Sequence, residues 1–97
     1  LLQHVQGMAI GDGVLYLADS YNHKIKRLNL STGIMTTIAG SGERGHDDGP
    51  VNDATFDEPA GVAFADGRIY VADTNNHLIR VIDLEAEVVT TLALKGL

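Results

Sequence analysis

The apolar residues of this chain occur in short runs that are separated by residues typical of turns. Four runs in the first half are predicted as β-strands at 7–10, 14–18, 24–30 and 34–39, and four in the second half at 61–64, 69–72, 78–84 and 88–93. The runs are rich in Val, Ile, Leu, Tyr and Thr, as strands are. No 11-residue window has the periodicity of an amphipathic helix. The pattern therefore predicts an all-β chain.

The two halves of the chain repeat each other. Residues 16–20, Tyr-Leu-Ala-Asp-Ser, return as Tyr-Val-Ala-Asp-Thr at 70–74, and every matching pair lies 54 positions apart. Residues 1–43 align with 55–97 without a gap, and 15 of these 43 pairs are identical. A repeat of this length is typical of folds built from stacked supersecondary units. The chain is therefore divided into a first repeat at 1–43, a connector at 44–54 and a second repeat at 55–97.

The residues between the expected strands predict the turns. Asp-Gly at 12–13 and again at 66–67 is a strong signal for a two-residue hairpin, because glycine accepts a positive φ. Ser-Thr-Gly at 31–33 marks the third turn of the first repeat. Its counterpart at 85–87, Glu-Ala-Glu, has lost the glycine. We therefore expect a different turn there.

The second strand of each repeat is apolar throughout, at 14–18 and at 69–72. A strand with one face in water would alternate between apolar and polar residues. Continuous apolarity instead indicates a sheet that is covered on both faces. A four-stranded sheet with a similar sheet on either side satisfies this requirement, as the blades of a β-propeller do.

Residues 16–26 and 70–80 resemble the NHL repeat of β-propellers, whose name is spelled here by Asn-His-Leu at 76–78. Residues 56–63, Phe-Asp-Glu-Pro-Ala-Gly-Val-Ala, resemble the entry into a blade of that family, and the connector resembles a subgroup in which the propeller follows a thioredoxin-like domain. The resemblance implies two four-stranded antiparallel blades belonging to a six-bladed ring.

Charge and composition narrow the range of partners. The chain has 97 residues, with 7 basic and 13 acidic ones, and a formal net charge of −6. Residues 44–60 hold five of the acidic residues and one basic residue. This excess of acidic residues argues against binding to a nucleic-acid backbone. No apolar run approaches the roughly 18 residues of a membrane helix. Because cysteine is absent, disulfides and thiolate chemistry are excluded, and the cellular compartment stays open.

One polar motif occurs in both repeats and could suggest acid–base or metal chemistry. It comprises Asp19, Asn22 and His23 in the first repeat and Asp73, Asn76 and His77 in the second. An aspartate at the end of a strand commonly caps the following turn through its backbone amides. Because a catalytic site rarely needs two copies, we interpret the motif as structural.

The connector carries the other candidate chemistry. Residues 40–45 fit the G-x-G-x-x-G pattern, but no helix is expected after them and the adjoining carboxylates would repel a pyrophosphate. The acidic residues around 46–53 could form a calcium site or a solvated loop. We favour the solvated loop, because the EF-hand pattern of calcium ligands is absent. Loops often carry contacts to partners, and the candidates here are Arg44, His46, Asp47 and Asp48. No catalytic, cofactor-binding or metal-binding residue is predicted.

Two blades alone would leave two sheet faces exposed that the pattern expects to be covered. Ring closure by a homotrimer, or by the remaining blades of a larger propeller, would cover both faces. We therefore expect a non-catalytic building block that self-assembles or binds a protein or small ligand, with neither nucleic acid nor membrane as partner and with no cofactor. A purely structural role is a further possibility. The alternative is a fragment of a larger propeller with lyase-type, metal-dependent activity, as some propellers of this kind have.

Overall fold

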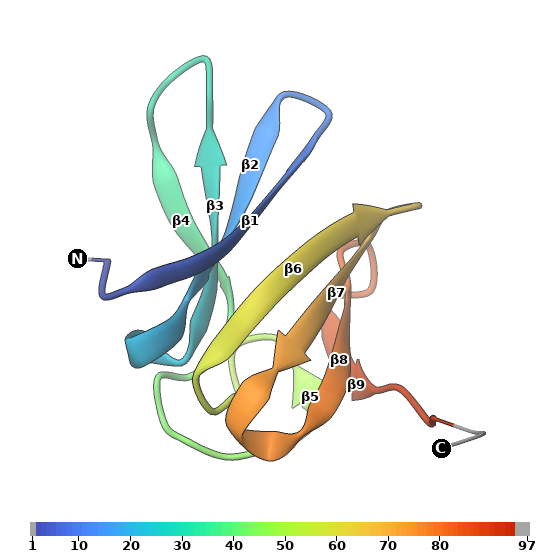
Figure 1. Cartoon of the computed structure of the whole chain (residues 1–97). Coiled ribbons are helices and arrows are strands. Elements are labelled where there is room, and N and C mark those ends of the chain that lie inside the picture. Colours follow the sequence, from blue (N-terminus) through green and yellow to red (C-terminus); the bar gives the residue numbers. More distant parts are fainter. Residues whose placement is uncertain (1, 95–97) are drawn as a thin grey trace.

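The computed structural model describes residues 2–94, which form two antiparallel β-sheets arranged as neighbouring blades (Figure 1). The predicted all-β fold is confirmed. The first and last residues of the two predicted repeats, 1 and 95–97, lie outside the described residues. The first sheet has the order β1-β2-β3-β4, with β1 at Val5–Gly11, β2 at Val14–Asp19, β3 at Lys24–Asn29 and β4 at Met35–Ala39. It is the expected meander of four strands.

The second sheet repeats this meander and adds one short strand. Its order is β5-β9-β8-β7-β6, with β6 at Pro59–Ala65, β7 at Arg68–Asp73, β8 at Leu78–Asp83 and β9 at Val88–Thr91. The extra strand, β5 at Gly49–Pro50, comes from the connector and pairs with β9. The expectation of four strands in this blade is therefore corrected to five, because the connector runs back along the outer edge of the second sheet.

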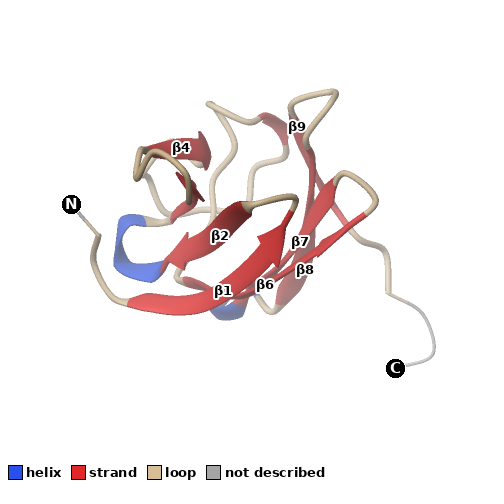
Figure 2. Cartoon of the chain, turned by 90° about the horizontal axis from the view of Figure 1, so that it is seen from above, coloured by secondary structure: helices blue, strands red, loops and turns tan. Residues whose placement is uncertain are grey.

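Two short 3-10 helices, η1 at Ser20–Asn22 and η2 at Thr74–Asn76, follow the second strand of each blade (Figure 2). Each ends at a histidine in the left-handed region, with φ of 57° at both His23 and His77. The sequence pattern did not indicate these helices, because three residues are too few for a helical periodicity.

The hairpin turns differ from expectation at one place. Asp-Gly at 12–13 and at 66–67 has positive φ at both positions, as a type I′ turn requires. The prediction of a different third turn in the second blade is wrong. Asn29 Oδ1 and Asp83 Oδ1 each accept backbone N–H bonds from the residues two and three positions later. Glu87, with φ of 57°, takes the left-handed position that Gly33 occupies with φ of 75°.

The core lies between the two sheets. Buried residues from the first sheet, the connector and the second sheet form one cluster: Tyr16, Ala18, Ile25, Ala39, Ala54, Phe56, Ile69, Val71, Ile82 and Val89. The innermost strands, β1 and β6, run side by side (Figures 1 and 2). Gly7 allows this close approach, because a Cβ atom there would overlap the carbonyl oxygen of Ala60. Within residues 2–94, no helix is long and apolar enough to cross a membrane.

Candidate functional site

The two buried aspartates of the repeated motif hold the chain segment that enters each blade. Asp19 accepts hydrogen bonds from the backbone N–H of Gln3 at 2.6 Å and from Asn22 Nδ2 at 2.8 Å, and Lys26 Nζ lies 2.7 Å from its Oδ2. Burial raises the pKa of Asp19, but these hydrogen bonds and the charge of Lys26 outweigh it. The pKa of Asp19 is therefore held below its usual value of 3.8.

Asp73 repeats this arrangement in the second blade. It accepts hydrogen bonds from the backbone N–H of Asp57 at 2.8 Å, from Asn76 Nδ2 at 2.7 Å and from Arg80 Nη1 at 2.8 Å. We expected both aspartates to cap the amides of the following turn, but neither 3-10 helix has a side-chain cap. The carboxylates instead bind an amide 16 residues earlier, because the blade entry passes beside the end of the second strand.

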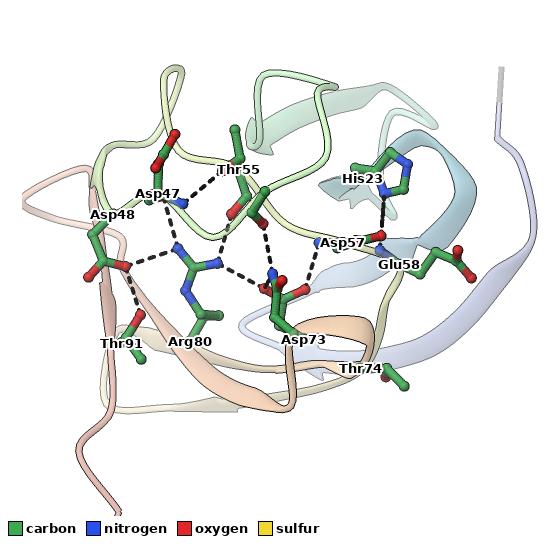
Figure 3. Close-up of polar contacts among 12 residues, drawn as sticks. His23, Asp47, Asp48, Thr55, Asp57, Glu58, Asp73, Thr74, Arg80 and Thr91 are labelled. Atoms are coloured by element: carbon green, nitrogen blue, oxygen red, sulfur yellow. Dashed lines mark hydrogen bonds and ion pairs between the residues drawn. The ribbon is translucent and has the colours of Figure 1, made fainter.

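The two histidines of the motif have different surroundings. His23 is buried, and its Nδ1 accepts a hydrogen bond from the backbone N–H of Glu58 at 3.0 Å, which joins the first blade to the second (Figure 3). Asp57 Oδ1 lies 3.9 Å from the same nitrogen. His77, its counterpart, is exposed. The histidine of the first copy of the motif therefore forms a hydrogen bond between the blades, whereas the histidine of the second copy has an exposed imidazole.

Arg80 anchors the connector to the second blade (Figure 3). Its side chain is fully buried, with the guanidinium 5.0 Å from the centre of the Phe56 ring. It donates to the carbonyl oxygens of Thr55 at 2.7 Å and Asp47 at 2.9 Å, and to the carboxylate of Asp48 at 2.9 Å. Together with Asp73, these bonds join three chain segments at one cation.

The four expected contact residues of the connector fall into two groups. Arg44 and His46 are exposed. Asp47 is held by its backbone, since its N–H donates to Thr55 Oγ1 at 2.8 Å and its carbonyl accepts from Arg80. Asp48 accepts from Thr91 Oγ1 at 2.8 Å as well as from Arg80. Asp47 and Asp48 therefore help to fix the connector, whereas Arg44 and His46 point to solvent.

Sequence reasoning missed Arg80 and its partner Thr55. One signal was present, because a basic residue stands at the same place of the third strand in both repeats, as Lys26 and as Arg80, and Arg80 lies within a run of apolar residues. A charge among Ile, Val and Leu must be paired when it is buried. Two of the partners, Asp47 and Asp48, could not be found in this way, because they lie in the connector and are 33 and 32 positions from Arg80.

Other possible ligand sites are limited. No group of three or more His, Asp or Glu side chains that could hold a metal ion is found among residues 2–94. A groove of about 280 Å³ runs between the blades at their outer rim, with Arg27 on the first blade and Asp83 and Glu87 on the second. Its lining carries charges of both signs together with threonines and apolar side chains. The groove therefore selects no single class of ligand.

Two sheet faces remain uncovered. The first outer face is the side of the first sheet that faces away from the second. Lys26 and Thr37 lie on it together with six apolar residues, of which Leu17 alone is buried: Met8, Ile10, Leu15, Leu17, Leu28 and Met35. The second outer face is the far side of the second sheet. Arg68 lies on it together with six apolar or aromatic residues: Ala63, Ala65, Tyr70, Ala72, Ile79 and Val81. Met8 and Ile10 are 63% and 66% exposed. A hollow of about 320 Å³ on the second outer face is lined by apolar residues and includes Tyr70 and Ile79.

Comparison with known proteins identifies the repeat. The family model of the NHL repeat matches residues 56–82. Protein SUPPRESSOR OF QUENCHING 1, chloroplastic, from Arabidopsis thaliana is 52% identical over 101 residues, which cover 99% of this chain and 10% of that protein. NHL repeat-containing protein 2 from Homo sapiens is 43% identical over 96 residues, which cover 94% of this chain and 13% of that protein. The chain thus spans about a tenth of the length of these curated relatives.

A solved structure shares the fold. The crystal structure of an auxiliary nutrient binding protein from Bacteroides thetaiotaomicron matches 97% of this chain and 23% of its own, with a TM-score of 0.53 and 21% sequence identity. At this identity the likeness concerns the fold alone. The repeated motif, the paired blades and the relatives agree that residues 56–82 form an NHL repeat and that the chain has the fold of two neighbouring propeller blades.

Proposed function

We propose that this chain is a non-catalytic building block that closes a six-bladed propeller by forming a homotrimer, and that the ring serves as a scaffold for binding a protein or small ligand. One observation carries the proposal. The repeat of 54 residues gives each outer face the same positions that are buried between the two blades. The chain thus carries both halves of an interface that it also forms within itself.

The second outer face corresponds to the buried side of the first sheet. Tyr70, Ala72 and Ile79 are the counterparts of Tyr16, Ala18 and Ile25, and each pair is identical. The three first-sheet residues are at most 5% exposed. Burial of the second outer face by a neighbouring blade would remove its apolar side chains from water at about 25 cal/mol per Å². This face is therefore suited to the same kind of contact.

The first outer face corresponds to the buried side of the second sheet. The counterparts of its six apolar residues are all apolar: Val62, Phe64, Ile69, Val71, Ile82 and Val89. The counterpart of its cation, Lys26, is the buried cation Arg80. Sheet faces that are exposed in a finished molecule are usually polar, so a largely apolar face supports a partner.

The sizes of the facing residues also agree. Within the chain, Gly11 lies against the Phe64 ring, so closely that a Cβ atom at position 11 would overlap the ring. The counterparts in a contact between two copies are Ala65 and Ile10. Ala65 is larger than Gly11 by a methyl group, and Ile10 is smaller than Phe64. The two changes in volume compensate each other, as dense packing requires. This exchange supports a head-to-tail contact between copies, and three copies with two blades each make six blades.

Because the relatives are about ten times longer, blades from a longer polypeptide are the competing source of the ring. Light scattering after size exclusion, over a concentration series, separates the two. A trimer has a mass of about 31 kDa, three times 10.3 kDa. Ile10→Glu would place a charge in the contact and should give a monomer. Ser31→Glu adds the same charge in a turn where the second repeat has Glu85, and should leave the trimer intact. A mass of 10.3 kDa or of a dimer at every concentration would overturn ring closure by copies.

For the scaffold role, we retain the exposed Arg44 and His46 as contact positions, because they project from the connector and have no counterpart in the first repeat. Replacing both with serine should weaken binding of a partner captured by the ring without changing its mass. An unchanged affinity would exclude this loop from the contact.

A further inference from the structure

A small pocket lies where the two blades meet, beside the hydrogen bond between His23 and Glu58. It has a volume of about 260 Å³ and is lined by Tyr21, His23, Arg44 and Glu58, and we call it the junction pocket. These residues come from the segment around η1, from the connector and from the entry into the second blade. The volume lies below the roughly 300–1,000 Å³ of pockets for drug-sized ligands, so the junction pocket suits a smaller molecule.

His23 supplies a hydrogen-bond donor at the junction pocket. Its side chain is only 8% exposed, and its Nδ1 accepts the backbone N–H of Glu58 at 3.0 Å. Because an accepting nitrogen carries no proton, the proton of the neutral ring lies on Nε2. Figure 3 shows this second ring nitrogen on the side of the ring away from the backbone of Glu58. Within residues 2–94, Nε2 has no acceptor for its proton, so a ligand can provide one.

Arg44 and Glu58 bring opposite charges to the junction pocket. The backbone of Arg44 is held by a parallel bridge to Phe56, and its exposed side chain forms no hydrogen bond or ion pair among residues 2–94. Glu58 Oε2 accepts a hydrogen bond from Asn75 Nδ2 at 3.0 Å, whereas Oε1 has no donor in the part of the chain that the structure describes. Both charges are therefore available to a ligand.

Tyr21 gives the junction pocket an aromatic wall. Its ring is stacked on the ring of His4, with centroids 4.6 Å apart and an angle of 9° between the planes. Its backbone N–H donates to the carbonyl oxygen of Gln3 at 3.2 Å, and the residue is 54% exposed. A tyrosine ring that is held in place and partly exposed can cover an apolar group of a ligand at a low cost in side-chain entropy.

We infer that the junction pocket binds a free α-amino acid with an apolar side chain. The carboxylate of the amino acid accepts from Arg44 and from His23 Nε2, and its ammonium group pairs with Glu58. Its side chain lies against the ring of Tyr21. One cation and one anion in the lining favour a ligand that carries both charges over a phosphate, which the carboxylate of Glu58 would repel. The inference rests on the proposed scaffold role, in which Arg44 is a contact position, and names a small ligand for that role.

Titration of L-leucine into the isotope-labelled chain, followed by NMR, tests the inference. Saturable shifts are expected at Tyr21, Arg44 and Glu58. Leucinamide lacks the carboxylate and N-acetylleucine lacks the ammonium group, so each should bind about tenfold more weakly than leucine. No saturable shift at millimolar leucine, or equal affinities for the three compounds, would overturn the inference.

Two variants assign the charges of the pocket to those of the ligand. Arg44→Gln should weaken the binding of leucine about tenfold without weakening that of leucinamide, which has no carboxylate for Arg44. Glu58→Gln should weaken the binding of leucine without weakening that of N-acetylleucine, which has no ammonium group. Arg27→Gln and Glu85→Gln remove the same charges from exposed residues outside the pocket and should leave every affinity unchanged. If Arg44→Gln left the affinity for leucine unchanged, or weakened leucine and leucinamide equally, the inference would be wrong.

The outcomes also separate this inference from the proposed function. All four lining residues belong to one chain, so binding does not require a trimer. Leucine binding by a chain with a mass of 10.3 kDa would retain the junction pocket and reject ring closure by copies. A trimer that captures a protein partner through Arg44 and His46 but binds no leucine would retain the scaffold and reject the amino acid.

Discussion

Replacement of Arg80 by methionine tests whether one buried cation holds the connector to the second blade. Methionine keeps most of the volume of the side chain but removes the charge and its donors. Asp73 is fully buried, so its carboxylate would lose its ionic partner without gaining water. Breaking a buried pair in this way costs about 3–5 kcal/mol. For a domain of this size, that is a large part of a total stability of about 5–15 kcal/mol.

The Arg80→Lys variant gives a graded comparison, since lysine is the residue of the first blade. It should keep the bond to Asp73, as Lys26 keeps its bond to Asp19, and lose the bonds to the carbonyls of Thr55 and Asp47. We expect an intermediate cost of about 1–3 kcal/mol from the carbonyls left unpaired.

Urea unfolding followed by far-UV circular dichroism measures these differences, provided that the slope of the transition stays constant. Arg68→Gln is the control, because Arg68 is half exposed and 4.0 Å from Asp83, and its loss should cost less than about 0.5 kcal/mol. Arg80→Met should lower the Tm by more than about 10 °C. A loss below about 1 kcal/mol would refute the role assigned to Arg80.

Three further changes should follow from the structure. Glu87→Gly should raise the free energy of unfolding by about 0.5–1 kcal/mol in urea, because glycine adopts the left-handed φ without strain; a destabilised variant would contradict the turn. Gly11→Ala should cost about 1–3 kcal/mol through overlap with the Phe64 ring, and Phe64→Ile should restore part of it; additive losses would show that the two do not touch. Because the pKa of Asp19 is lowered in the folded chain, its contribution to stability is full above about pH 4 and is lost as the pH falls through the lowered value; Asp19→Asn should flatten this part of the pH profile, and an unchanged slope would exclude Asp19 as its cause.

Local patterns predicted the fold because the strands and hairpins depend on neighbouring residues. Apolar runs located all eight long strands, and Asp-Gly at 12–13 located a type I′ turn through its backbone preference. The turn after β8 was not predicted, since the side chain of Asp83 supplies the hydrogen bonds that hold the turn and Glu87 tolerates the left-handed conformation. The loss of a glycine from a pattern therefore did not change the turn.

The contacts of the site depended on residues far apart in the sequence. Arg80 meets Asp47, Asp48 and Thr55, which lie 33, 32 and 25 positions away. Strand β5 has only Gly49 and Pro50, so no periodicity could indicate it. The repeat itself was the stronger guide, because comparing each buried residue with its counterpart 54 positions away shows which surfaces lack a partner.

Disulfide cross-linking between the outer faces tests the central claim most directly, because the chain has no cysteine of its own. In a head-to-tail trimer, Ile10→Cys and Ala65→Cys should lie as close as positions 64 and 11 do within one chain, and mild oxidation should give a covalent trimer. Gly11→Cys with Phe64→Cys is the control and should give a cross-linked monomer. If the control pair forms its bond and the Ile10→Cys, Ala65→Cys chain stays an uncross-linked monomer, the two outer faces do not meet and the proposed ring of copies is wrong.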